Sequence, residues 1–164
     1  MSNARNILPE CYADTLLVEI LGFPKANNQF SIGQVFKTMD TKMSKQLAVG
    51  VTDKDKKIKS NYYKAFQEDK AENGIRRLKH PDRKHYLIEH IPLESFLFKT
   101  AASVEVNPSN YGFDSIKSLA KLTKKQNIGD NQNFKQFLNT LHQKNAPSFL
   151  TMKNWLTELV GELY

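Results

Sequence analysis

The sequence lacks the features that mark membrane-spanning, secreted and disulfide-rich proteins. Its single cysteine, Cys11, has no second cysteine in the chain with which to pair. There is no run of about 18 apolar residues, roughly the length that a helix needs to cross a bilayer. The polar residues after Met1 do not have the apolar core of a signal peptide. These absences favour a soluble protein of the cytoplasm.

A glycine-rich phosphate-binding loop is also missing, which argues against a nucleotide-hydrolysing motor in this chain. The 164 residues are 40% hydrophobic and 25% charged, the balance of one globular unit with an ordinary core. Lys and Arg number 24 against 17 Asp and Glu, which leaves a net charge of +7. This excess suits a polyanionic partner, and nucleic acid is the commonest one. The alternative is a basic protein without an anionic partner.

The spacing of apolar residues predicts an α/β protein. The uncharged run from Leu47 to Thr52 is typical of a strand buried on both faces. The runs 75–78 and 86–91 form either a hairpin or two separate strands of a mixed sheet. In the first part of the chain we expect strands at 6–10, 47–52, 75–78 and 86–91, and helices at 11–21, 31–45 and 92–104.

Beyond residue 106 the pattern is helical throughout, with helices expected at 114–124, 132–144 and 149–162. Their aromatic stripes are typical of core positions, and we assign them no ligand. The sequence therefore predicts a small, mostly parallel sheet flanked by helices over residues 1–106. Residues 107–164 form a helical C-terminal extension packed on the same core.

Carboxylates follow the first two predicted strands. Asp53 and Asp55 come directly after the buried strand, and Glu10 closes the first one, with Asp14 one helical turn later. If the two strands are parallel neighbours, these four acids meet at one edge of the sheet, where α/β proteins bind ligands. Mg²⁺, or Mn²⁺, is the usual cation for such an oxygen-rich site. The competing interpretation is that Asp53 and Asp55 belong to a solvated turn.

These residues resemble the pattern of the Toprim fold, which is shared by topoisomerases, bacterial primases and the OLD-family nucleases. That pattern has Glu-Gly-x-x-Asp after the first strand, here Glu10 to Asp14, and Asp-x-Asp after a later one, here Asp53 to Asp55. The resemblance covers about the first hundred residues. It implies that Glu10 is a general acid or base and that Asp53 and Asp55 bind Mg²⁺. Cys11 stands where the family usually has glycine.

Two further groups complete the predicted site. Glu94 opens a helix after a later strand, where nuclease-type Toprim domains similarly place an acid, so the resemblance adds it to the metal ligands. Lysines that follow Asp53 are expected to contact the nucleic-acid backbone: Lys54, Lys56, Lys57 and Lys59. They are alternatively an ordinary solvated face.

Two other chemistries are weaker interpretations of the sequence. A histidine and acid cluster, which includes His80, His85 and His90, suggests zinc, but it lacks the cysteines or the His-x-x-x-His spacing of a familiar site. Cys11 would be a nucleophile if a histidine lay beside it, but nothing in the sequence shows that the two meet. A buried cysteine fits the pattern better.

The leading hypothesis is a small Mg²⁺-dependent nuclease that acts on DNA or RNA. The rival hypothesis is a non-catalytic Toprim-like module that binds nucleic acid or a partner protein such as a separate ATPase. The chain's small size and Cys11 in place of glycine favour that rival. A third interpretation treats the acids as surface turns of a basic domain.

Overall fold

The strands expected around Glu10 and Thr52 are parallel neighbours in the computed structural model, which describes residues 3–54, 58 and 60–161. Residues Ile7–Pro9 (β1) lie beside Ala48–Asp53 (β2), with Ile7 opposite Val49. The helices Tyr12–Ile20 (α1) and Ile32–Asp40 (α2) connect them. The prediction that the two strands are adjacent and parallel is confirmed.

The sheet is mixed, with five strands in the order β1-β2-β5-β4-β3. His85–His90 (β5) runs parallel to β2, whereas Ile75–Lys79 (β4) and Gln67–Glu72 (β3) continue the sheet in antiparallel fashion. Two of the strand pairs are parallel and two are antiparallel, so a mostly parallel sheet is not confirmed. The runs near 75–78 and 86–91 form the hairpin that was one of the two options.

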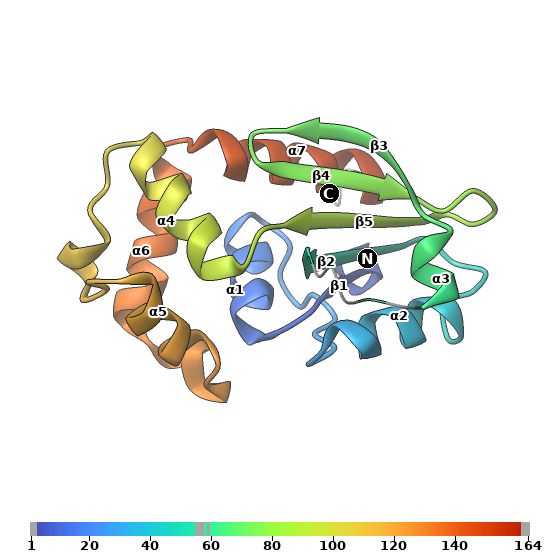
Figure 1. The fold of residues 1–164 in the computed structure, drawn as a ribbon, viewed down its shortest axis with the longest axis horizontal. Coiled ribbons are helices and arrows are strands. Elements are labelled where there is room, and N and C mark those ends of the chain that lie inside the picture. Colours follow the sequence, from blue (N-terminus) through green and yellow to red (C-terminus); the bar gives the residue numbers. More distant parts are fainter. Residues whose placement is uncertain (1–2, 55–57, 59, 162–164) are drawn as a thin grey trace.

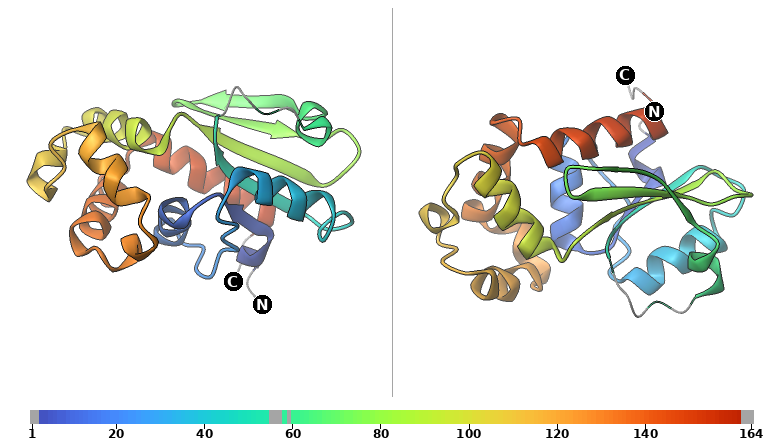
Figure 2. Two further views of the ribbon diagram at one scale, coloured as in Figure 1. Left: turned by 60° about the horizontal axis from the view of Figure 1, so that its bottom comes forward. Right: turned by 45° about the horizontal axis from the view of Figure 1, so that its top comes forward.

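Helices cover both faces of the sheet (Figure 2). α2 and the short helix Asn61–Lys64 (α3) lie on one side, over Leu8, Leu78 and Leu87. The opposite side carries α1, together with Leu93–Ser103 (α4) and Pro147–Val160 (α7), on a core that includes Val49, Val51 and Ile88. β2 is buried throughout except at Asp53, as expected of a strand covered on both faces.

The residues after 106 are helical, as expected, and their helices are Ile116–Thr123 (α5), Gln132–Gln143 (α6) and α7. Short 3₁₀ turns stand at Asn3–Asn6 (η1), Pro108–Tyr111 (η2) and Gln126–Asp130 (η3). Phe113, Phe134 and Phe137 pack against one another in this part of the core. The division of the chain at residues 106 and 107 stays a prediction.

The starts of the first two helices are fixed by their caps. The Cys11 thiol accepts a hydrogen bond from the Asp14 N–H, and the Ser31 hydroxyl accepts one from the Gln34 N–H. α2 ends at Asp40 rather than near Lys45, because turns occupy residues 41–45. In the part of the chain that the structure describes, every helix is too short or too polar to span a bilayer.

Gly50 of β2 is closely surrounded by neighbouring side chains. A Cβ at this position would come within 2.7 Å of Leu87 Cδ2 and 3.0 Å of Val35 Cγ1. We expect Gly50→Ala to destabilise the fold by about 1–3 kcal/mol through overpacking. Urea unfolding would measure the effect, with Gly33→Ala as the control, because that helical position has no neighbour within 4 Å. Equal stability of Gly50→Ala and the wild type would contradict the packing described here.

Candidate metal centre

β2 and β5 end at the same edge of the sheet (Figure 1). Four ionisable side chains meet at this edge, which also includes the end of β1. Glu10 directly follows β1, and its N–H donates to Val51 O of β2 at 3.0 Å. Asp53 and His90 end their strands as register partners. Asp14 comes from the first turn of α1, which begins immediately beyond β1. Parallel pairing of the three strands therefore brings these groups to one edge of the sheet.

His90 is the buried centre of the cluster, with 1% of its surface exposed. Its Nε2 lies 2.8 Å from Asp14 Oδ1, and its Nδ1 lies 2.6 Å from the Ile91 carbonyl oxygen. A carbonyl and a carboxylate only accept hydrogen bonds, so this geometry suits an imidazolium with both nitrogens donating. Burial alone would lower the pKa of His90, but the adjacent Asp14 outweighs it and raises the pKa to about 9.

Asp53 forms an ion pair with His90. Its Oδ1 is buried and has no hydrogen bond among the described residues, although His90 Nδ1 lies 3.2 Å away. Burial is the main cause that raises the pKa of Asp53 to about 6, and His90 acts against it. The side chain as a whole is 37% exposed, so a ligand can reach its outer part from solvent, although Oδ1 itself is buried. A buried carboxylate oxygen without a hydrogen bond costs free energy, and the ion pair with His90 offsets part of that cost.

Glu10 sits beside Asp53 at the rim of the cluster. Its Oε2 accepts a hydrogen bond of 2.8 Å from the Asp53 N–H. Burial, followed by repulsion from Asp53 and Asp14, raises the pKa of Glu10 to about 7 despite that bond. Glu10 can therefore take up and release a proton close to neutral pH.

The Cys11 thiol belongs to the same network but is not activated. Its Sγ donates to Asp14 Oδ2 at 3.3 Å, and burial together with the Asp14 charge raises the pKa of the thiol. The thiolate is the nucleophilic form of cysteine, so this environment suppresses the reactivity that a catalytic cysteine needs. Cys11 acts here as a helix cap.

The other predicted site residues are divided between the site and its surroundings. Glu94, in the first turn of α4, is near enough for its charge to raise the pKa of Asp53, but its carboxylate accepts a hydrogen bond from the Thr123 hydroxyl. Lys54 is exposed, and its N–H donates to the His90 carbonyl oxygen at 2.7 Å. The remaining members lie outside the described residues: Asp55, Lys56, Lys57 and Lys59.

His90 is the site residue that sequence reasoning did not select. The sequence suggests it as a zinc ligand with His80 and His85, or as a histidine beside Cys11. In the structure His85 is instead bonded to the Tyr62 hydroxyl and the Met43 carbonyl, and His80 stacks on Tyr62. The position of His90 could have indicated its role, because it ends a strand just as Asp53 does.

Asp14, Asp53 and His90 form a group that can hold a metal ion. One ligand atom from each lies within 4.8 Å of the other two. Carboxylate oxygens with one imidazole nitrogen suit several divalent ions. Asp53 Oδ1 has no hydrogen bond among the described residues, so a bound cation would take the place of its ion pair with His90. The residues present are thus chemically suited to a divalent metal.

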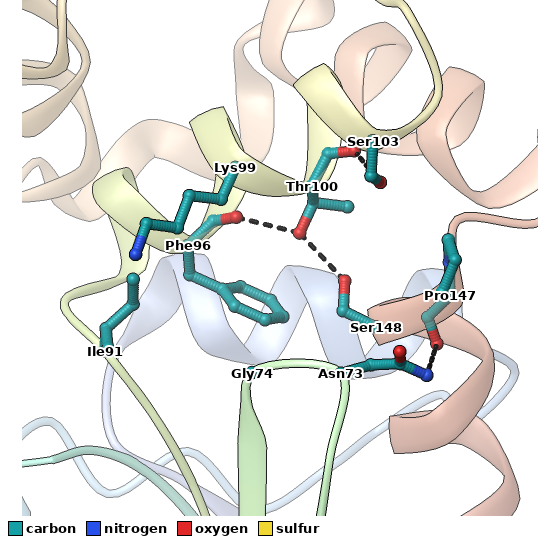
Figure 3. Close-up of a pocket in the computed structure, with 9 residues that line it drawn as sticks. All are labelled: Asn73, Gly74, Ile91, Phe96, Lys99, Thr100, Ser103, Pro147 and Ser148. Carbon is teal, nitrogen blue, oxygen red and sulfur yellow. Dashed lines mark hydrogen bonds between the residues drawn. The ribbon is translucent and has the colours of Figure 1, made fainter.

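A cavity of about 340 Å³ adjoins this cluster without containing its acids (Figure 3). It lies between the β3–β4 turn, α4 and the start of α7, and Lys99 is the one ionisable residue among the described residues that line it. The His90 ring stacks on Phe96, whose side chain lines the cavity, with the two centroids 5.3 Å apart. We therefore assign the chemistry to the edge of the sheet rather than to the cavity.

Comparison with known protein families, with characterised proteins and with solved structures finds no match.

Proposed function

We propose that this protein is a metal-dependent enzyme that cleaves phosphodiester bonds in nucleic acid. The observation that carries the proposal is the meeting of Glu10, Asp14, Asp53 and His90 at the carboxyl edge of parallel strands. Concentrated acids at such an edge are poor structural elements and good metal ligands.

Asp14, Asp53 and His90 would hold the ion, which we propose to be Mg²⁺ or Mn²⁺. When bound, such an ion polarises a phosphoryl oxygen and lowers the pKa of a water molecule. His90 would have to give up a ring proton to act as a ligand, because both of its nitrogens make hydrogen bonds. An imidazole among the ligands favours Mn²⁺ more than an all-oxygen site does.

Glu10 would act as the general acid or base. Its pKa of about 7 suits proton transfer at neutral pH. Its fixed place beside Asp53 would keep that proton next to the ion. The order of Glu10 and Asp14 after one strand and Asp53 after its parallel neighbour agrees with the Toprim resemblance.

The net charge of +7 supports nucleic acid as the substrate. Lys54 stands next to the cluster, and α5, which packs against α4, carries Lys117 and Lys121 without any acid. A phosphate drawn to Lys54 would lie near Asp53, the residue that precedes it.

The test is an assay of the purified wild type on labelled single- and double-stranded oligonucleotides with Mg²⁺, with Mn²⁺ and with chelator. We expect cleavage that depends on the metal, and a melting temperature that rises with millimolar metal because only the folded state binds it. Absence of both effects would refute the enzyme and the metal site together.

A non-catalytic module is the second candidate, and the His90–Asp14 pair favours it. A protonated His90 neutralises Asp14 without any metal, so these two residues form a complete ion pair on their own. Such a module would bind nucleic acid or a partner such as a separate ATPase. Binding of oligonucleotides without metal-dependent cleavage or a metal-induced melting shift would select this candidate.

A further inference from the structure

The aromatic side chain of Phe30 is unusually exposed. It is 65% accessible, the highest value among the large apolar side chains of the described residues. Its ring meets the Tyr12 ring edge to face, with 5.3 Å between the centroids. Tyr12 is the first residue of α1, two positions after Glu10. The aromatic pair therefore lies at the first turn of α1, the turn that also carries Asp14 on another face of the helix.

The backbone holds Phe30 in this position at a cost. Phe30 has φ +72°, a left-handed conformation that is unfavourable for any residue with a Cβ. Its N–H donates to Asn28 Oδ1 at 3.0 Å, and the next residue, Ser31, caps α2. An aromatic residue in such a conformation, with its ring in solvent, gains little for the fold itself.

Gln29, the neighbour of Phe30, anchors the segment to the end of β1. Its N–H donates to the carbonyl oxygen of Pro9 at 3.0 Å, and Pro9 is the residue that precedes Glu10. Its buried Oε1 accepts a bond of 2.6 Å from the Thr38 hydroxyl. Phe30 is thus presented from a fixed anchor at the edge of the site.

We propose that Phe30, supported by Tyr12, is a stacking platform for a base of single-stranded nucleic acid whose backbone passes the metal centre. The inference rests on the proposed function and names the form of its substrate. Aromatic rings with a free face bind single strands by stacking, while lysines hold the phosphates. Duplex DNA does not offer an unstacked base, so the platform selects single strands.

The test measures binding of a labelled single-stranded oligonucleotide by fluorescence anisotropy, in chelator and at low salt. We expect Phe30→Ala to weaken binding about 5- to 100-fold, the range for the loss of one stacked base. Alanine has the same Cβ, so the backbone constraint at φ +72° is unchanged. The salt dependence should stay the same because no phosphate contact is lost. Phe30→Trp should bind at least as well as wild type and show fluorescence quenching by the base.

Two controls make the result specific to stacking. Leu150→Ala removes another exposed apolar side chain, on α7, and should leave binding unchanged. An abasic oligonucleotide of equal length should bind the wild type as weakly as the normal strand binds Phe30→Ala. Equal affinities of wild type and Phe30→Ala would overturn this inference and leave the metal-dependent enzyme standing. Absence of oligonucleotide binding by the wild type would overturn it as well. The melting temperature with and without metal would then test the metal centre separately.

Discussion

Glu10→Gln is expected to lower metal-dependent cleavage about 10²- to 10⁴-fold, the usual loss when a general acid or base is removed. The amide keeps the size of the side chain and can still accept the hydrogen bond from the Asp53 N–H. It cannot exchange a proton near neutral pH. Because Glu10 is not among the three proposed ligands, the metal-induced rise in melting temperature should persist. Rates on oligonucleotides and melting curves with Mn²⁺ measure the two effects.

Asp53→Asn is the matched variant that separates metal binding from proton transfer. It should abolish both cleavage and the melting shift, because the carboxylate is a proposed ligand. Without metal it should melt slightly higher than wild type at pH 7.5. The reason is that burial raises the pKa of Asp53 to about 6, so the folded state carries an unfavourable charge above that pH. Activity retained by Asp53→Asn, or a metal shift lost in Glu10→Gln alone, would contradict the assigned roles.

Asp14→Ala is expected to destabilise the protein by about 3–5 kcal/mol at pH 6, the typical cost of removing one partner of a buried ion pair. Asp14 and His90 are each 1% exposed, so water cannot replace the lost partner. Urea unfolding in chelator gives the free energy. Asp40→Ala, which removes a more exposed ion pair with Arg83, should cost less than about 1 kcal/mol.

The same ion pair makes stability depend on pH. The pKa of His90 is raised to about 9 in the folded state, so its stabilising contribution is complete below about pH 6.5 and is lost as pH rises through 9. The raised pKa values of Glu10 and Asp53 also make the wild type less stable as pH rises, between about pH 4 and pH 7. The free energy of unfolding of Asp14→Ala should change little between pH 7 and 9.5. If it falls with pH as steeply as that of the wild type, His90 is neutral in the folded wild type.

The sequence contained enough information to predict the central strands and the positions of Glu10, Asp14 and Asp53 in the site. The apolar run 47–52 can satisfy its pattern only as a buried strand, which fixed the place of Asp53 beside Glu10. Asp14 followed from helical spacing. These inferences succeeded because burial on both faces leaves little freedom in how a strand is placed.

The residues that were missed depend on contacts distant in sequence. β3 reads Gln-Glu-Asp-Lys-Ala-Glu, has all six residues exposed, and exists because it pairs with β4. Tertiary pairing overrides its low β-propensity. His90 joins the site only because β5 lies parallel to β2, and the sequence of the 75–91 hairpin does not specify that partner.

The two outer strands differ in how they avoid pairing with other molecules. Charged side chains occupy most of β3, and they oppose the addition of another chain's strand. On the outer side of β1, N–H groups of Asn27 and Gln29 use the carbonyls of Ile7 and Pro9 that a foreign strand would need. The loop that presents Phe30 therefore also protects the edge of β1 from pairing with a strand of another molecule. Shortening this loop would expose an apolar sheet edge, so its length is constrained by solubility as well as by any role of the aromatic ring.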